Sequence, residues 1–141
     1  ADATIVIKAA AVADYRPQQR SSEKIKKTDS SLTVKLVKNP DILAELGRRK
    51  GDRVLIGFAA ETEQLTRNAA KKLEEKNLDL IVANDITCAG AGFAVDTNIV
   101  KILSRSGAVE ELPLMAKETL ADAILDRVVL LRVHKREEER K

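Results

Sequence analysis

The sequence has 141 residues, of which 44% are hydrophobic and 33% are charged, and its formal net charge is +3 at pH 7. This composition is typical of a single globular domain and excludes a disordered chain. The small net charge and the aromatic content of 2% argue against a nucleic-acid-binding surface. No apolar run approaches the roughly 20 residues that cross a bilayer.

The first third of the chain combines two predicted strands with a polar segment. Residues 4–9 (TIVIKA) form a β-branched run, which predicts a buried parallel strand. Residues 18–31 indicate a loop with a basic middle. Residues 32–38 (LTVKLVK) alternate apolar and polar side chains, which predicts a half-exposed strand.

A short helix is predicted over residues 39–51 (NPDILAELGRRKG). Asn39 can cap it, Pro40 suits its first position and Gly51 can end it. A helix N-terminus also attracts anions, but Asn39 can satisfy one of its N–H groups and Pro40 has none to offer. The pattern therefore indicates a helix start, with an anion site as the alternative.

The second half of the chain alternates strands with helices. Residues 53–60 (RVLIGFAA) and 78–85 (LDLIVAND) predict buried strands, joined by the helix TEQLTRNAAKKLEEKN. Residues 97–104 (TNIVKILS) and 108–114 (AVEELPL) flank the turn RSG and predict a β-hairpin. A final helix is predicted from about Leu114, and it ends in a charged, frayed tail within residues 132–141.

This order predicts βαβ units and a mainly parallel α/β sheet. In such sheets ligands bind beyond the carboxyl ends of the strands. The rule selects four places, at residues 9–16, 39–42, 58–62 and 84–96.

Small and polar residues gather at the first of these places. Ala9, Ala10 and Ala11 follow a strand, and their small side chains let a ligand reach the backbone. Asp14 can accept hydrogen bonds from a ligand or help to hold a metal. The alternative is that the alanines pack under a helix that Asp14 caps.

Three lysines are candidates for phosphate binding. Lys24 lies in the predicted loop (EKIKK), whereas Lys72 and Lys76 are four residues apart and share one face of a helix. Each lysine also fits a solvated surface. Phe58 also has two interpretations, because an aromatic ring suits contact with a nucleotide base as well as packing in the core.

Covalent catalysis is not indicated. The only cysteine, Cys88, has no evident base, since the only histidine, His134, lies in the final helix. No His/Cys cluster suggests zinc, and neither a glycine-rich dinucleotide motif nor a P-loop occurs.

Six motifs follow one another in a fixed order: AAVADYRP, EKIKK, VKNPDIL, GFAAET, KNLDLIVAND and GFAVDTN. In this order the chain resembles the phosphopantothenoylcysteine synthetase domain of coenzyme A biosynthesis. In bacteria that domain is usually the carboxyl-terminal half of a protein whose other half is a flavin-dependent decarboxylase. The resemblance implies a three-layer, Rossmann-like α/β domain over residues 1–131, with helices on both faces of the sheet, followed by the charged tail.

The resemblance also implies a ligase. CTP, with Mg²⁺, activates the carboxylate of 4′-phosphopantothenate as an acyl-cytidylate, and the amine of cysteine then displaces CMP. Lys24 matches the lysine needed to form the acyl-nucleotide, and Ala10, Ala11 and Asp14 match substrate-binding positions. Residues that would hold the metal are unknown. The matched nucleotide-binding positions are Lys8, Ala9, Ala10, Asp14, Lys24, Asn39, Pro40, Asp41, Ile42, Phe58, Lys72 and Lys76.

A cytoplasmic homodimer is further implied, with residues 32–38 and the hairpin at 97–112 as dimerisation elements, and with neither nucleic acid nor membrane as a partner. FMN is implied only for the absent decarboxylase half. Family members carry an earlier glycine-rich strand–turn–helix that nothing before Ala1 supplies. We therefore expect a fragment that binds nucleotide and dimerises but has no ligase activity of its own. An unrelated α/β interaction module with solvated lysines is the remaining alternative.

Overall fold

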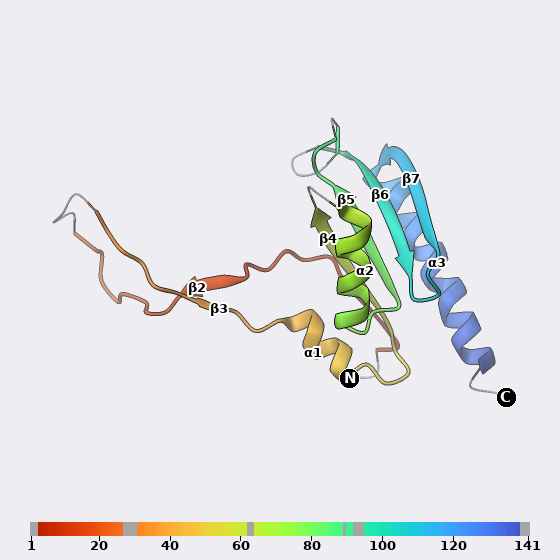
Figure 1. Ribbon diagram of the computed structural model, residues 1–141, viewed down its shortest axis with the longest axis horizontal. Coiled ribbons are helices and arrows are strands. Elements are labelled where there is room, and N and C mark those ends of the chain that lie inside the picture. Colours follow the sequence, from red (N-terminus) through yellow and green to blue (C-terminus); the bar gives the residue numbers. More distant parts are fainter. Residues whose placement is uncertain (1–2, 27–30, 62–63, 89, 92–94, 139–141) are drawn as a thin grey trace. The chain divides into compact units, whose positions relative to one another are not determined.

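The chain divides into two compact units, which are described separately (Figure 1). The computed structural model describes residues 3–26, 31–61, 64–88, 90–91 and 95–138. The larger unit comprises residues 1–9 and 43–141, and the smaller comprises residues 10–42.

A five-stranded sheet forms the centre of the larger unit, with the order β1-β4-β5-β6-β7 (Figure 1). Strands β1, β4 and β5 are mutually parallel, whereas β6 and β7 pair antiparallel as a hairpin. The predicted mainly parallel sheet with a hairpin is therefore confirmed. The strands are β1 (Ile5–Lys8), β4 (Val54–Glu61), β5 (Leu80–Asp85), β6 (Thr97–Ser104) and β7 (Val109–Ala116).

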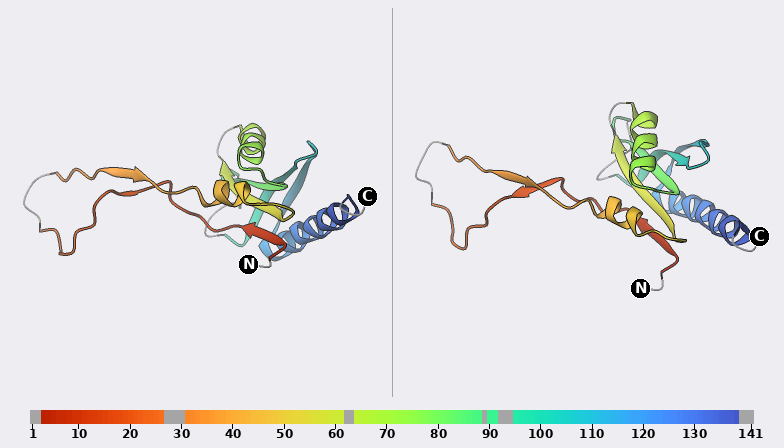
Figure 2. Two further views of the ribbon diagram at one scale, coloured as in Figure 1. Left: turned by 90° about the horizontal axis from the view of Figure 1, so that it is seen from below. Right: turned by 60° about the horizontal axis from the view of Figure 1, so that its bottom comes forward.

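Helices cover both faces of this sheet, which confirms the predicted three layers (Figure 2). One face packs on α3 (Lys117–Glu138), and the other packs on α1 (Ile42–Arg48) and α2 (Leu65–Glu75). Successive side chains of a strand point to opposite faces. In β4, for example, Ile56 lies in the core against α3, while Leu55 lies in the core against α1 and α2.

Two predicted helix boundaries are wrong. Helix α1 begins at Ile42, so Asn39 and Pro40 precede it. The amide of Asn39 instead donates to the carbonyl of Ala13 at 2.6 Å, a partner from a distant segment that local sequence does not reveal. Helix α3 begins three residues later than Leu114, because ladder pairing keeps β7 extended through Ala116.

The carboxyl-terminal end of α3 is also longer than expected. The helix continues to Glu138, so its last described turns include part of the charged tail predicted to fray. The side chain of Lys135 holds these last turns in place, because it binds the carboxylate of Asp79 and the carbonyl of Arg53 at the amino-terminal end of the sheet.

The smaller unit is a two-stranded antiparallel ribbon formed by β2 (Tyr15–Pro17) and β3 (Leu36–Lys38). The strand predicted over residues 32–38 is thus only three residues long, and β2 is not predicted at all. Pro17 lacks an N–H donor and, like every residue of β2, is exposed. Such a short strand carries no periodic signal of its own.

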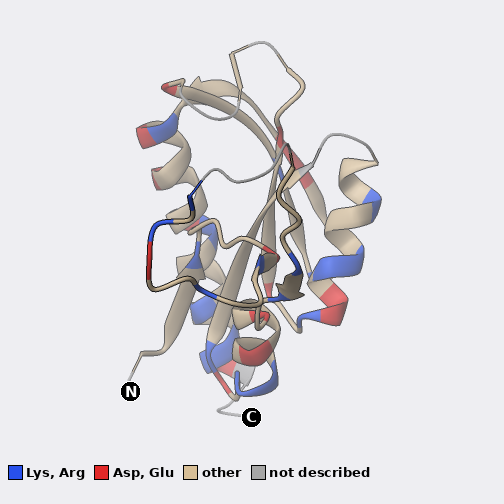
Figure 3. Cartoon of the chain, turned by 90° about the vertical axis from the view of Figure 1, so that its left-hand side faces the viewer, with Lys and Arg blue, Asp and Glu red and all other residues tan. Residues whose placement is uncertain are grey.

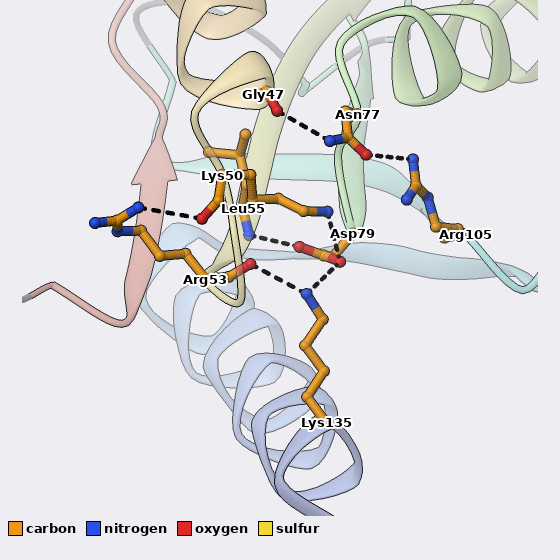
Figure 4. Close-up of polar contacts among 8 residues, drawn as sticks. All are labelled: Gly47, Lys50, Arg53, Leu55, Asn77, Asp79, Arg105 and Lys135. Atoms are coloured by element: carbon orange, nitrogen blue, oxygen red, sulfur yellow. Dashed lines mark hydrogen bonds and ion pairs between the residues drawn. The ribbon is translucent and has the colours of Figure 1, made fainter. Parts of the chain in front are cut away.

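Asp79 organises the amino-terminal edge of the larger sheet (Figure 4). Its carboxylate accepts the backbone N–H of Leu55 at 2.7 Å, the ammonium of Lys50 at 3.0 Å and that of Lys135 at 2.9 Å. Lys135 also donates to the carbonyl of Arg53 at 3.1 Å. The carboxylate therefore joins β4, the end of the α1 segment and α3 at one point.

Burial by itself would raise the pKa of the Asp79 carboxyl, but the hydrogen bonds from Leu55, Lys135 and Lys50 outweigh burial and lower that pKa. A depressed carboxyl pKa stabilises the fold above the pKa of the unfolded chain. The contribution is lost as pH falls through the lowered folded pKa.

Replacing this carboxylate tests its role. Asp79→Asn leaves the side chain of Lys50, which is 7% exposed, without its counter-charge, and we expect the free energy of unfolding to fall by about 3 kcal/mol. Acid titration of the unfolding midpoint should also lose part of its steepness below about pH 4. Glu111→Gln is the matched control, because Glu111 pairs with Lys101 at the exposed surface, and it should change stability by less than about 1 kcal/mol. Equal losses in the two variants would contradict the assignment.

Candidate functional site

The carboxyl ends of the parallel strands meet at one edge of the larger unit. Lys8 ends β1 beside Gly57, and Glu61 and Asp85 end β4 and β5 side by side. Because β1 and β5 flank β4, three of the places selected from the sequence share this edge. The edge lies at the opposite end of the strands from the Asp79 cluster, so the fold-stabilising charges are separated from the candidate residues at the strand ends. Lys76, at the carboxyl end of α2, lies instead toward the Asp79 end of the sheet.

Two candidate side chains at this edge, those of Phe58 and Lys8, lie on opposite faces of the sheet. Phe58 lines a hollow of about 320 Å³ on the α3 face, together with Ile7, Leu120 and Lys117 among others. Lys8 follows Ile7 and so points to the other face, the face of α1 and α2. The structure therefore does not bring the Phe58 ring together with the lysine side chains on that face.

Lys72 lies on α2 and Lys76 is the residue that caps its carboxyl end, so the two lysines are one turn apart as the spacing predicts. Both are half-buried, whereas Lys71 is exposed and pairs with Glu75 at 3.7 Å. Asn68, four residues before Lys72, continues this half-buried stripe. The basic residues of α2 precede its two acidic residues (Figure 3), and burial rather than charge distinguishes Lys72 from its neighbour Lys71.

A close contact between α1 and the carboxyl end of α2 fixes where these lysines lie along the length of the sheet. A Cβ built on Gly47 would overlap the backbone carbonyl of Lys76, so only glycine permits this approach of α1 to the end of α2. The amide of Asn77 donates to the carbonyl of Gly47 at 2.9 Å and accepts from Arg105 at 2.6 Å. Asn77 has φ 53°, a left-handed conformation that asparagine tolerates.

The smaller unit brings two distant candidates together. The N–H of Asn39 donates to the carbonyl of Asp14 at 2.8 Å. Arg16 donates to the carbonyl of Lys38 at 3.0 Å and to the side-chain oxygen of Asn39 at 2.9 Å. Arg16 carried no role in the sequence analysis. Its position in the DYRP motif was the available signal, and its bonds hold together the two segments on which Asp14 and Asn39 lie, just before β2 and just after β3.

The remaining candidates of the smaller unit are exposed. Lys27 of the EKIKK motif lies outside the described residues. Lys24 follows a turn in which the Ser21 hydroxyl donates to the carbonyl of Glu23 at 2.6 Å. These exposed residues are Ala10, Ala11, Lys24, Pro40, Asp41 and Ile42, and Ala9 of the larger unit is exposed as well.

The segment after β5 contains no activated thiol. The hydroxyl of Thr87 donates to Asp85 at 2.6 Å, and this bond, followed by the Thr87 N–H, lowers the pKa of Asp85. Burial first, and the Asp85 carboxylate second, raise the pKa of the Cys88 thiol. A raised pKa reduces the fraction of the thiol that is present as the nucleophilic thiolate.

Asn84, near the end of β5, has a buried side-chain oxygen with no hydrogen-bond partner among the described residues.

No group of three or more His, Cys, Asp or Glu in the described ranges could hold a metal ion. Mg²⁺ commonly uses one or two carboxylates together with substrate phosphates, so the donor set fits a metal that enters with a nucleotide better than a resident metal. Within the same ranges, no helix combines the length and apolar character needed to cross a membrane.

The sequence matches, over residues 1–131, the family model described as DNA/pantothenate metabolism flavoprotein C-terminal domain. It is 50% identical over 127 residues to the coenzyme A biosynthesis bifunctional protein CoaBC of Bacillus subtilis (strain 168), covering 90% of this chain and 31% of that protein. The chain thus spans about a third of the length of the curated relatives it matches.

Two solved structures are similar in fold. The crystal structure of the C-terminal domain of coenzyme A biosynthesis bifunctional protein CoaBC has a TM-score of 0.72 and 39% identity, covering 92% of this chain and 55% of that chain. The DNA/pantothenate metabolism flavoprotein from Streptococcus pneumoniae has a TM-score of 0.74 and 25% identity, covering 92% and 64% respectively.

The contact at Gly47 can be tested by adding one methyl group. Gly47→Ala should lower the free energy of unfolding by about 3 kcal/mol, because the methyl group must displace backbone atoms of Lys76. Gly51→Ala is the control: its Cβ would meet nothing within 4 Å, and we expect a cost of about 1 kcal/mol because its φ of 55° is unfavourable for an L side chain. Chemical denaturation measures both, and a smaller loss for Gly47→Ala than for Gly51→Ala would refute the close contact.

Proposed function

Because the chain belongs to the family of the DNA/pantothenate metabolism flavoprotein C-terminal domain, we propose that it supplies the nucleotide-binding part of a phosphopantothenate–cysteine ligase in coenzyme A biosynthesis. The name of its Bacillus relative, a bifunctional protein of that pathway, supports the assignment. FMN belongs in this proposal to the decarboxylase half of such proteins, and the site of action is the cytoplasm.

The proposed reaction has two steps. The carboxylate of 4′-phosphopantothenate attacks the α-phosphorus of CTP, and pyrophosphate leaves. The amine of cysteine then attacks the acyl carbon, CMP leaves with the bond electrons, and an amide remains. No protein nucleophile is required, which is consistent with the raised pKa of Cys88. Mg²⁺ bound to the phosphates supplies charge neutralisation.

Lys72 and Lys76 are the observation that carries the proposal. Two half-buried lysines one turn apart are better suited to binding a polyanion than to a fully solvated surface. We assign Lys24 to the transferring phosphoryl group, because a mobile lysine can follow the charge that develops there. Asn39, Pro40, Asp41, Ile42 and the backbone around Phe58 complete the proposed nucleotide contacts, with Lys8 and Ala9.

We assign the contacts with 4′-phosphopantothenate to Ala10, Ala11 and Asp14 of the AAVADYRP motif. Ala10 and Ala11 are exposed and small, so an amide of the substrate can reach their backbone. Asp14 lies just before β2, and its carbonyl accepts the N–H of Asn39 just after β3. Its carboxylate can accept a hydrogen bond from a substrate amide or hydroxyl.

The lysine assignment predicts a clear pattern in calorimetric titration with CTP and Mg²⁺. Lys72→Ala and Lys76→Ala should each weaken binding about tenfold, since each removes a charge-assisted hydrogen bond. Lys71→Ala should change the affinity less than about twofold, because Lys71 is exposed and pairs with Glu75. No CTP binding by the unaltered chain would favour the interaction-module alternative. Pyrophosphate release by this chain with both substrates would contradict the alternative of an inactive fragment.

We also propose that the smaller unit pairs with a second copy of the chain. An isolated two-stranded ribbon is only marginally stable in water, and this one exposes Leu32, Val34 and Leu36. Apolar side chains in alternate positions of one segment suit a sheet continued across a two-fold axis.

The pairing proposal predicts the effect of added charge. The double substitution Val34→Asp with Leu36→Asp should shift the chain from dimer to monomer in sedimentation at micromolar concentration. Lys35→Asp, between the two, changes charge without removing an apolar side chain and should leave the dimer largely intact. A monomeric unaltered chain would overturn the proposal.

A further inference from the structure

Arg16 joins the two segments of the smaller unit to which the ligand contacts are assigned. The segment that ends at Asp14 precedes β2, and the segment that starts at Asn39 follows β3. The ladder between these strands pairs Tyr15 with Lys38 as its last residues at this end. Beyond that pair, the N–H of Asn39 donates to the carbonyl of Asp14 at 2.8 Å.

Two side chains extend this connection past the ends of the strands. The Nη1 of Arg16 donates to the carbonyl of Lys38 at 3.0 Å and to the side-chain oxygen of Asn39 at 2.9 Å. The amide nitrogen of Asn39 in turn donates to the carbonyl of Ala13 at 2.6 Å. A primary amide accepts on one side and donates on the other. The bond from Arg16 therefore fixes the side of Asn39 that faces Ala13.

Backbone pairing by itself holds these two segments weakly. The strands β2 and β3 pair over three residues each, and so short a two-stranded ribbon is at best marginally stable in water. Every residue of β2 is exposed, so burial adds little to the ladder at this strand. The side-chain bonds of Arg16 and Asn39 therefore carry much of the connection between the segment before β2 and the segment after β3.

The contact suits a guanidinium group in particular. A guanidinium is planar and presents its N–H donors in a fixed arrangement, whereas the ammonium of lysine is a mobile point charge. Both acceptors of Arg16 are neutral oxygens, one from the main chain and one from an amide. The contact therefore depends on the geometry of the donors more than on the positive charge.

We propose that Arg16 is a positioning residue of the ligase site. Through Asn39 it keeps the substrate-contacting segment before β2 in register with the nucleotide-contacting segment after β3, and it touches neither ligand itself. A nucleotide that immobilises residues 39–42 thereby also immobilises the backbone at Ala13 and Asp14. This inference rests on the proposed function.

Tyr15 provides a built-in probe of this connection. It is the only tyrosine of a chain that has no tryptophan, and it lies between Asp14 and Arg16 with its side chain exposed. Its fluorescence lifetime is measured at increasing acrylamide concentrations, with and without saturating CTP and Mg²⁺. In the unaltered chain we expect the nucleotide to lower the acrylamide quenching constant about twofold, because the segment that carries Tyr15 becomes more rigid.

Arg16→Lys keeps the positive charge but loses the fixed pair of donors. We expect it to weaken CTP binding about fivefold in calorimetric titration and to abolish the response of Tyr15 even at saturating CTP. Arg20→Lys is the matched control, because it makes the same change at another exposed arginine of the smaller unit. It should bind CTP and show the Tyr15 response like the unaltered chain.

A second variant changes the other partner of the contact. Asn39→Asp keeps an acceptor for Arg16 but removes the donor to the carbonyl of Ala13, and it should also abolish the response of Tyr15. Thermal unfolding of each variant reports whether the fold is retained. Asn39→Asp keeps the test decisive if Arg16→Lys unfolds.

The outcomes separate the role of Arg16 from the function on which it rests. If the unaltered chain binds CTP and Lys72→Ala weakens that binding, but Tyr15 does not respond to the nucleotide, the role assigned to Arg16 is overturned and the proposed function stands. The same conclusion follows if Arg16→Lys retains the full response, since charge alone then suffices. If the unaltered chain binds no CTP, the proposed function fails and the role of Arg16 fails with it.

Discussion

The buried carboxylate of Asp79 is the constraint on which the larger unit depends. It receives the N–H of Leu55 and the ammonium groups of Lys50 and Lys135, while its backbone carbonyl receives the N–H of Arg105 at 3.1 Å. One residue thereby ties β4, the α1 segment, α3 and the turn of the hairpin to the start of β5. A buried charge with a full set of donors tolerates little displacement of any of them.

This arrangement leaves the opposite edge of the sheet free for ligands. The contacts at the amino-terminal end of the sheet hold the elements together, so the residues at the carboxyl ends of β1, β4 and β5 are available to bind ligands. The contact at Gly47 links the two regions, because it docks α1 against the last turn of α2 and so sets the level of Lys72 and Lys76. A substitution at Gly47 should therefore displace both lysines.

Much of the fold could be predicted from local pattern. Local sequence is enough to recognise the β-branched runs of β1, β4 and β5 and the periodicity of α2, because these patterns do not depend on distant contacts. Residue spacing alone predicts that Lys72 and Lys76 share one face. Boundaries set by distant partners could not be predicted. Asn39 resembles an N-cap by local rules, but hydrogen bonds to Ala13 and Arg16, more than twenty residues away, hold it outside the helix.

The sequence by itself determined the class of fold, the family, and which residue types stand at the carboxyl ends of the strands, because these follow from periodicity and from the order of motifs. Only the tertiary structure decided which side chains share a face. The sheet separates the ring of Phe58 from the side chain of Lys8, although both residues belong to motifs at one edge. That separation follows from strand register and helix packing, which depend on contacts between residues distant in the chain.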